Sequence, residues 1–165
     1  LAFFQQIKDG EIIRNGVKGY SVTIPHKEGV LAVLDEVDEL AQKIGAVNTV
    51  LEREGRLFGY NTDSSAAIFS LEPALGESPE GTALSGKRVV VLGAGGAARA
   101  VVFALSQKGA KVTILNRTVE RAKRLAQEVG AKWGPLSDIS KMKMDVLVNA
   151  TSVGMYPEVS HLRSP

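Results

Sequence analysis

The hydrophobic and polar positions at the start of the chain change their period twice, and each change marks a predicted element. Residues 18–24 alternate like a strand with one buried face, and the alternation ends at Pro25, which cannot donate to a sheet. Residues 26–34 carry apolar side chains at helical spacing, which places Lys27 at a helix start. Residues 35–45 predict a second, acidic helix that stops at a glycine. A lysine at a helix start opposes the helix dipole, so its placement hints at a function.

A hairpin pattern follows these two predicted helices. Residues 45–51 and 56–61 are strand-like runs separated by a short polar turn that ends in glycine. The second run leads into a helical stretch, in which Thr62 or Asp63 is expected to cap the first turn with a side-chain oxygen. Capping is therefore one interpretation of Asp63, and participation in chemistry is the other.

An apolar run that stops at glycines opens the second half of the chain. Residues 89–92 predict a strand buried on both faces of a parallel sheet. Gly93 then suits a tight turn, Gly95 leaves room for a pyrophosphate against bare backbone, and Ala98 occupies the close-packing position of the G-x-G-x-x-A pattern. A helix and a second strand at 111–115 complete a βαβ unit, so the sequence predicts a dinucleotide site.

The tip of that second strand reads Asn116, Arg117 and Thr118, with Arg121 close behind, and contains no acidic residue. Sites for NAD usually place a carboxylate there to hold the ribose 2′-hydroxyl. A carboxylate would repel a 2′-phosphate, whereas a guanidinium can bind it with two hydrogen bonds. The pattern favours NADP over NAD. The outer face of an amphipathic helix is the alternative for the basic residues from Arg121 to Arg124.

A further buried-strand pattern covers residues 144–149 and leads into a loop that begins at Ala150. Ligands of open parallel sheets bind beyond the carboxyl ends of the strands, so this loop should border the nicotinamide. An ordinary strand-to-loop turn is the alternative.

Composition narrows the class of protein. The 165 residues are 44% hydrophobic and 23% charged, which is typical of a globular protein, and no apolar run approaches the length of a membrane span. The net charge of +2 is small and dispersed, so small molecules are more plausible partners than nucleic acid. The chain has no cysteine, which excludes disulfides and thiolate chemistry and fits a reducing cytosol. We expect a cytoplasmic protein that binds no metal and no membrane.

The domain organisation follows from a segment rich in Gly, Ser and Pro between the two halves. We expect a partial substrate-binding domain at 1–75, a linker at 76–85 and a partial nucleotide-binding domain at 86–165. The first residues include no initiator methionine, and the last ones form no closing element. The chain is therefore expected to be truncated at both ends.

Six motifs, taken together and in this order, resemble the shikimate dehydrogenase family. They are Ser21-Val22-Thr23-Ile24-Pro25-His26-Lys27, Gly45-Ala46-Val47-Asn48-Thr49, Gly59-Tyr60-Asn61-Thr62-Asp63, Gly93-Ala94-Gly95-Gly96-Ala97-Ala98, Asn116-Arg117-Thr118 and Asn149-Ala150-Thr151-Ser152-Val153-Gly154-Met155. The resemblance implies an α/β fold with two α/β domains, an incomplete substrate domain followed by an incomplete Rossmann-type NADP-binding domain. It also implies reduction of 3-dehydroshikimate to shikimate with NADPH, in aromatic amino-acid biosynthesis.

The same resemblance implies roles for individual residues. Lys27 and Asp63 match the catalytic pair, and Thr23 and Asn48 match residues that hydrogen-bond substrate hydroxyls, with Asn61 a weaker candidate. Three groups of residues match positions that bind the cofactor. The turn at the phosphates comprises Gly93, Gly95, Gly96 and Ala97, and the residues at the adenosine phosphate are Asn116, Arg117, Thr118 and Arg121. The residues beside the nicotinamide are Thr151, Ser152 and Met155.

Departures from the family pattern leave three alternatives open. The family's paired serines for the substrate carboxylate and its C-terminal helix have no counterpart in the sequence. A quinate or quinate/shikimate dehydrogenase is the first alternative, because part of the substrate choice would reside in that serine segment. An inactive NADP-binding fragment is the second, and one module of a larger fused pathway enzyme is the third.

Overall fold

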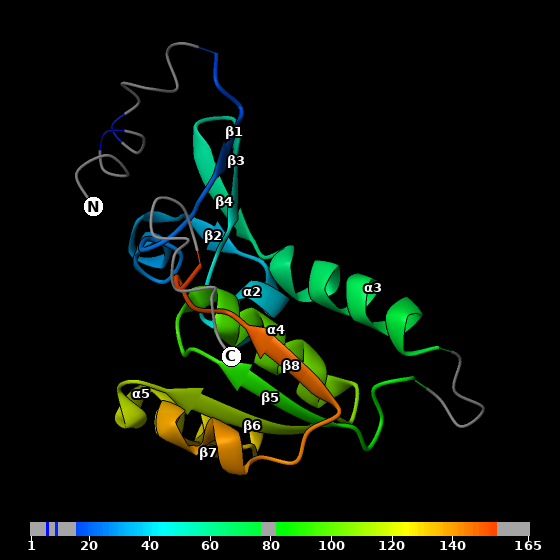
Figure 1. Ribbon diagram of the computed structural model, residues 1–165. Helices are drawn as coiled ribbons and strands as arrows, with labels where there is room; N and C mark the ends of the chain where they lie inside the picture. Colours follow the sequence, from blue (N-terminus) through cyan, green and yellow to red (C-terminus); the bar gives the residue numbers. More distant parts are fainter. Residues whose placement is uncertain (1–5, 7–8, 10–15, 77–81, 155–165) are drawn as a thin grey trace.

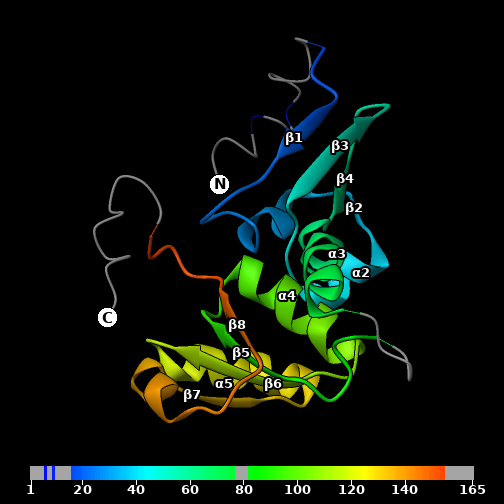
Figure 2. The same ribbon diagram turned by 45° about the vertical axis from the view of Figure 1, so that its right-hand side comes forward.

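The computed structural model describes residue 6, residue 9 and the ranges 16–76 and 82–154, and it contains two four-stranded sheets (Figure 1). The middle of the expected linker and the chain beyond Gly154 lie outside the described residues. Helix α4 (Gly96–Gln107) lies between the two sheets, and both views of the ribbon agree on this (Figures 1 and 2).

The first sheet has the strand order β1-β3-β4-β2. Its strands are β1 (Gly19–Ser21), β2 (Glu36–Val37), β3 (Thr49–Arg53) and β4 (Arg56–Tyr60). β3 and β4 form the predicted hairpin, in which Thr49 pairs with Tyr60 and Arg53 with Arg56. Gly59 allows the close packing behind this hairpin, because a Cβ there would lie 2.4 Å from Cδ1 of Leu34 and 2.9 Å from Cγ2 of Val47.

Two expectations for the first half need correction. The alternation at 18–24 forms a strand only over Gly19–Ser21, and the predicted helix at 26–34 is a short 3-10 helix, η2 (Gly29–Val33). Lys27 therefore lies in a turn before this helix, so the expected conflict with an α-helix dipole does not arise. The expected helix at 35–45 is divided into β2 and α2 (Glu39–Ile44), because β2 pairs in parallel with β4 and Asp38 then caps α2.

The second sheet is parallel throughout and has the order β7-β6-β5-β8. Its elements after α3 (Asp63–Leu75) are, in chain order, β5 (Arg88–Leu92), α4, β6 (Lys111–Asn116), α5 (Val119–Val129), β7 (Lys132–Pro135), the 3-10 helix η3 (Leu136–Lys141) and β8 (Val146–Asn149). The predicted βαβ unit is confirmed. After β7 the chain returns to the other side of β5, which creates a topological switch point between β5 and β8, the place where such sheets bind ligands.

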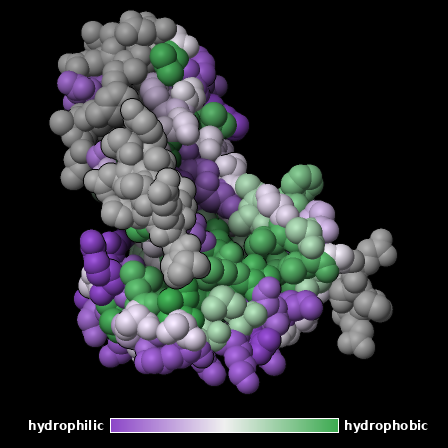
Figure 3. Space-filling view, in the orientation of Figure 1, coloured by the Kyte–Doolittle hydropathy of each residue, from purple (hydrophilic) through white to green (hydrophobic). Residues whose placement is uncertain are grey.

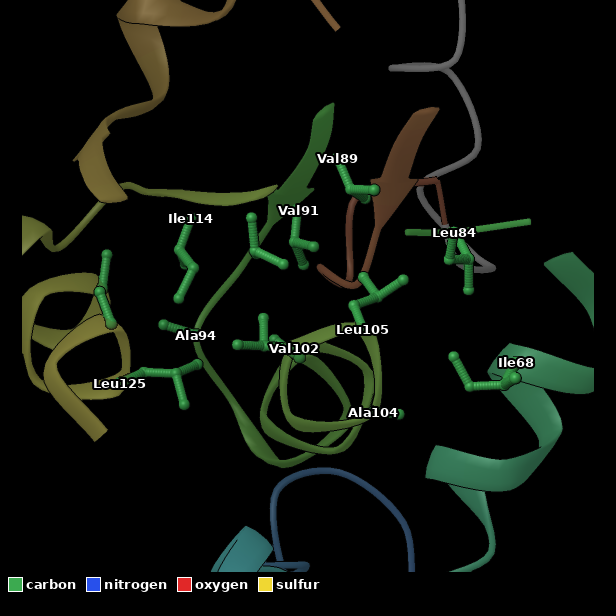
Figure 4. Packing of buried hydrophobic residues seen from close by; sticks show 14 residues of the cluster. Ile68, Leu84, Val89, Val91, Ala94, Val102, Ala104, Leu105, Ile114 and Leu125 are labelled. Atoms are coloured by element: carbon green, nitrogen blue, oxygen red, sulfur yellow. The ribbon is translucent and has the colours of Figure 1, made fainter. Parts of the chain in front are cut away.

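The core of this half lies on one face of the parallel sheet. Side chains of α4 and α5, such as Val102 and Leu125, pack against strand residues such as Val91 and Ile114 (Figure 4). Ile68 of α3 joins the same cluster from the side. The core therefore ties the helix that follows the first sheet to the second sheet.

The opposite face of β8 is less covered than its apolar sequence predicts. Leu147 is 50% exposed, whereas a strand in the middle of a doubly covered sheet would bury it. Hydrophobic side chains gather in this region of the surface, over β8 and its neighbours (Figure 3). Val90 of β5, which pairs with Leu147 on the same face, is buried, so the exposure follows from the position of β8 at the edge of the sheet in the described part of the chain.

Candidate active site

A pocket of about 360 Å³ lies at the carboxyl ends of β5, β6 and β8 and is closed on one side by the turn before η2. It is lined by Ile24, Pro25, Lys27, Glu28, Gly93, Ala94, Gly95, Gly96, Asn116, Arg117, Arg121, Leu136, Ala150, Thr151, Ser152 and Val153. Nine of the predicted site residues occur in this set. The pocket thus joins segments from both halves at the switch point.

The glycine turn shapes one wall of the pocket through its backbone. Gly93 has φ +108°, and a Cβ there would lie 2.9 Å from the carbonyl oxygen of Ala150, so only glycine fits. A Cβ on Gly95 would meet nothing within 4 Å, which leaves open space over the first turn of α4. Ala98 is fully buried, as its close-packing position requires. No side chain caps α4, so its first amides are available to an anion.

Basic residues follow the tip of β6. Asn116 donates from Nδ2 to the carbonyl oxygen of Thr118 at 2.9 Å and shapes the turn that presents Arg117, which is exposed and lines the pocket. Arg121 reaches across the pocket from α5, and its Nη2 lies 3.4 Å from Oε1 of Glu28. This ion pair joins the two halves over the pocket. Nothing in the sequence pattern pointed to Glu28, because its partner is 93 positions away.

The Lys27 ammonium and the Asp63 carboxylate form an ion pair at one end of the pocket. Nζ of Lys27 lies 2.6 Å from Oδ2 of Asp63, and the two side chains are 14% and 27% exposed. Partial burial weakens solvent screening, so this pair holds the ammonium more firmly than an exposed one would. Asp63 itself does not line the pocket; it contacts Lys27 from behind.

Asn48 fixes the other oxygen of Asp63. Its Nδ2 donates to Oδ1 of Asp63 at 2.7 Å and to Oγ1 of Thr62 at 2.9 Å, while its Oδ1 accepts from the backbone amide of Thr62 at 3.0 Å. Oδ1 also accepts from the hydroxyl of Thr49 at 2.9 Å. In this structure the Asn48 side chain therefore orients the Lys27–Asp63 pair, and both ends of its amide are engaged.

The N-cap of α3 differs from the expectation. Neither Thr62 nor Asp63 caps the helix with its side chain. Instead, Oδ1 of Asn61 accepts from the amides of Asp63 and Ser64 at 3.0 and 3.4 Å, and its Nδ2 donates to the carbonyl oxygen of Ala46 at 2.9 Å. Because Asn61 takes over the cap, the Asp63 carboxylate is released for Lys27. Asn61 is buried, which suits this structural role.

The glycine turn and the lysine segment meet at Gly96. A Cβ built on Gly96 would lie 2.8 Å from Cβ of Lys27 and 3.5 Å from Cβ of Ala46. Any side chain at this position would push the two halves apart. The absence of one brings Lys27 against the start of α4, beside the phosphate-binding backbone.

The loop after β8 is held by Asn149. Its Oδ1 accepts from the amide and the hydroxyl of Thr151 at 3.1 and 2.7 Å, and its Nδ2 donates to the carbonyl oxygen of Val153 at 3.1 Å. Thr151 and Ser152 line the pocket, as expected for this loop. Met155 lies outside the described residues.

Besides Asp63 and Asn48, three predicted residues lie away from the pocket wall. Thr23 is exposed in the turn after β1, and its carbonyl oxygen accepts from the amide of His26 at 2.9 Å. Ala97 and Thr118 flank lining residues without lining the pocket themselves. Besides Glu28, the sequence interpretation missed Leu136, which belongs to the unexpected helix η3. The signal for η3 was absent, since residues 136–141 contain no buried side chain.

The described residues contain neither a cluster of metal-binding side chains nor a membrane-spanning helix. No group of three or more His, Cys, Asp or Glu side chains in the described ranges could hold a metal ion. Among those same residues, no helix has both the length and the apolar character needed to cross a membrane.

Sequence models of two families match the chain. The shikimate dehydrogenase substrate binding domain matches residues 3–50, and shikimate / quinate 5-dehydrogenase matches residues 76–156. The chain belongs to the shikimate dehydrogenase family. The first region ends within β3, and the second contains all four strands of the parallel sheet.

Relatives within the family extend beyond this chain. It is 46% identical over 150 residues to a shikimate dehydrogenase (NADP(+)) of Shouchella clausii, covering 88% of this chain and 53% of the relative. It is 47% identical over 153 residues to a bifunctional 3-dehydroquinate dehydratase/shikimate dehydrogenase of Arabidopsis thaliana, covering 86% of this chain and 25% of the relative. The chain thus spans about half the length of the bacterial relative and a quarter of the plant one.

A solved structure of the family shares the fold. The shikimate 5-dehydrogenase of Thermus thermophilus, in complex with NADP(H) and shikimate, superposes with a TM-score of 0.72 at 45% identity. The match covers 92% of this chain and 53% of that one. The α/β class with a Rossmann-type parallel sheet is therefore confirmed.

Proposed function

We propose that the protein is an NADP-dependent oxidoreductase that reduces 3-dehydroshikimate to shikimate. The observation that carries this proposal is the Lys27–Asp63 ion pair, placed directly against the phosphate turn at Gly96. A proton donor and a dinucleotide-binding backbone share one pocket there. Membership of the family supplies the substrate class, and the relatives named above act on or bind shikimate and NADP.

Lys27 serves the reduction as proton donor. NADPH, when bound, supplies the hydride to the ketone carbon. The carbonyl oxygen becomes negative as the hydride arrives, and the Lys27 ammonium both stabilises this charge and delivers the proton from Nζ. Asp63, whose Oδ2 lies 2.6 Å from that nitrogen, holds the ammonium in place. In the oxidative direction, the neutral amine of Lys27 takes the proton back.

The residues around the glycine turn fit NADP. The bare backbone of Gly95 and the open amides of α4 suit the pyrophosphate, with Gly93, Gly96 and Ala97 completing the turn. Arg117 and Arg121 would hold the 2′-phosphate, with Asn116 and Thr118 shaping the loop that presents Arg117. Binding requires Arg121 to exchange its contact with Glu28 for the phosphate.

Substrate and nicotinamide contacts complete the assignment. Thr151, Ser152 and Met155 would border the nicotinamide. Thr23 and Asn48 would hydrogen-bond substrate hydroxyls, and Asn48 already orients Asp63. A site that hydrogen-bonds a substrate hydroxyl discriminates strongly against analogues that lack this hydroxyl. We further propose that residues 1–75 and 86–165 belong to separate substrate and cofactor domains joined at 76–85.

An assay of the complete natural protein that carries this sequence tests the proposal. We expect oxidation of NADPH on addition of 3-dehydroshikimate, a much slower reaction with NADH, and the reverse reaction with shikimate and NADP. Comparable or faster oxidation of quinate would favour the quinate alternative, which the family description includes. NADP binding with no turnover of any of these substrates would contradict the proposed reaction.

The possibility of a fused pathway enzyme rests on the plant relative, in which a dehydratase accompanies the dehydrogenase. The same assay, run with 3-dehydroquinate as the starting substrate, distinguishes a fused enzyme from a dehydrogenase without a dehydratase. Oxidation of NADPH that begins from 3-dehydroquinate would indicate a fused dehydratase.

A further inference from the structure

Arg99 joins the cofactor half to the substrate half, although it does not line the pocket. It lies in the first turn of α4, three positions after Gly96. Its Nε donates to the carbonyl oxygen of Ile44 at 2.6 Å, at the C-terminal end of α2. Its Nη1 and Nη2 donate to the two carboxylate oxygens of Glu128 at 3.2 and 2.6 Å.

Neighbouring groups hold the Arg99 guanidinium in place. The side chain of Arg99 is only 17% exposed, and Glu128 of α5 fixes its planar fork from the far side. Gly45 caps α2 with φ +70°, and a Cβ there would lie 2.7 Å from Nη2 of Arg99. Ile44 also packs with Ala100 of α4 in a small buried cluster. The last turn of α2 is therefore clamped to the first turn of α4.

The clamped segment leads directly to the reacting groups. Two positions after Gly45, the amide of Val47 donates to the carbonyl oxygen of Lys27 at 2.8 Å. Between them, the carbonyl oxygen of Ala46 accepts from Asn61, which caps the helix that carries Asp63. Residues 44–47 thus fix the backbone under both members of the ion pair.

We propose that Arg99 is a positioning residue, which sets the location of the Lys27–Asp63 pair relative to the phosphate turn by clamping residues 44–47 to α4. The inference rests on the proposed function. Catalysis by proximity demands this registration, because a displacement of about 1 Å between proton donor and reacting carbonyl can cost a hundredfold in rate. The guanidinium itself does not line the pocket, so the substitution should leave cofactor affinity nearly unchanged.

Arg99→Met in the complete natural protein tests this role, since Met keeps the apolar stem and removes every donor. We expect kcat to fall by about tenfold to a hundredfold, while the Kd for NADPH, measured by fluorescence titration, stays within about threefold. Arg99→Lys, which can reach only one acceptor, should give an intermediate kcat. If the Met variant does not fold, the Lys variant carries the same comparison.

The matched control is Arg88→Met, which removes another two-point contact with a carboxylate, that of Asp145, at the opposite end of β5. It should leave kcat unchanged. Equal losses of kcat in the two variants, or a kcat within about twofold of wild type in Arg99→Met, would overturn the inference.

Hydrogen exchange separates this inference from the proposed function, because it requires no turnover. Loss of the clamp should accelerate exchange of the Val47 amide in Arg99→Met and leave it unchanged in Arg88→Met. Unchanged exchange at Val47 overturns the positioning role even if the enzyme is active. Faster exchange supports that role even if the natural substrate proves to be another ketone.

Discussion

The two halves of the pocket are built in different ways. On the side of the parallel sheet, the functional groups follow from backbone geometry: strands end at one edge, Gly93 turns at φ +108°, and the first amides of α4 are open. On the side of the mixed sheet, they depend on a chain of side-chain hydrogen bonds, from Asn48 to Asp63 to Lys27.

This difference indicates how each half can fail. A backbone site tolerates changes of side chain, except where a Cβ would occupy the space of the ligand or of another strand. A hydrogen-bonded site depends on each side chain in turn, because loss of one leaves its partner unpaired. Substitutions on the side of the mixed sheet should therefore lower turnover. Substitutions on the side of the parallel sheet should weaken cofactor binding.

Lys27→Ala should show the largest effect. Turnover of 3-dehydroshikimate should fall at least about a hundredfold, the usual contribution of a general acid, because the substitution removes the ammonium that Asp63 holds. The Kd for NADPH should change little. Steady-state kinetics and a binding titration check both statements, with Lys43→Ala, an exposed lysine paired to Glu39 on α2, as the control. Turnover within about tenfold of wild type would refute the assignment.

Two alanine substitutions in the glycine turn should separate folding from binding. Gly95→Ala meets nothing in the protein, so it should leave the free energy of unfolding nearly unchanged and weaken NADP binding by occupying the space of the pyrophosphate. Gly93→Ala should destabilise the fold by about 1–3 kcal/mol, because φ is +108° and the Ala150 carbonyl lies in the way. Urea unfolding and cofactor titration distinguish them. Equal losses of stability would contradict the open space at Gly95.

The paired substitution Arg117→Ala with Arg121→Ala tests the choice of cofactor. Hydrogen bonds to charged groups contribute about 1.5–3 kcal/mol each, so the Kd for NADP should rise about tenfold or more while the Kd for NAD hardly moves. Arg124→Ala, an exposed arginine in the same helix, is the matched control. If both cofactors weaken equally, the 2′-phosphate is not bound by these residues.

The same contrast explains what the sequence could predict. β5, α4 and β6 were recognisable because apolar runs end at glycines, and the pocket then followed from the rule for parallel strands. β2 was missed because Glu36 and Val37 are too few to show a period and are held by pairing with β4. The cap at Asn61 was missed because three neighbouring polar residues could each have supplied it, and only the contact with Ala46 selects one.

The roles of residues on the side of the mixed sheet were even harder to predict from the sequence. Lys27 and Asp63 are 36 positions apart in sequence, and no period relates them; the resemblance alone brought them together before the structure did. Glu28 was overlooked although it is adjacent to Lys27, because its partner belongs to the other half. Tertiary side-chain contacts of this kind leave no local pattern in a sequence.

Glu28→Gln should give a smaller effect, on the boundary between the two sides. The Glu28 carboxylate is 3.4 Å from Arg121 and competes with the 2′-phosphate for it, so its neutralisation should tighten NADP binding. Exposed ion pairs contribute about 0–1 kcal/mol, which limits the gain to about fivefold. Titration with NADP and NAD measures it. Glu36→Gln, which breaks the exposed pair with Arg56, is the control and should change neither Kd. A higher Kd for NADP in Glu28→Gln would contradict the competition between Glu28 and the 2′-phosphate.

The smallest effect is expected far from the pocket, where Asp145 connects the start of β5 to the approach of β8. The Arg88 guanidinium and backbone amide hold the pKa of this carboxyl well below its usual range. A depressed folded-state pKa gives stability that is complete above the unfolded value of about 3.9 and is lost as the pH falls below it. Asp145→Asn should therefore lower the free energy of unfolding at pH 7, and the difference from wild type should shrink below about pH 4.

Urea unfolding of wild type and Asp145→Asn at pH 7 and at pH 3 measures that difference, with turnover at pH 7 as the control. Because the pair lies on the strand ends opposite the glycine turn, kcat should remain that of the wild type. A difference in stability that grows on acidification would contradict the direction of the pKa shift. A loss of turnover would instead show that the parallel sheet transmits changes from the amino ends of its strands to the pocket. The part of the site formed by the backbone would then depend on distant side chains more than its geometry indicates.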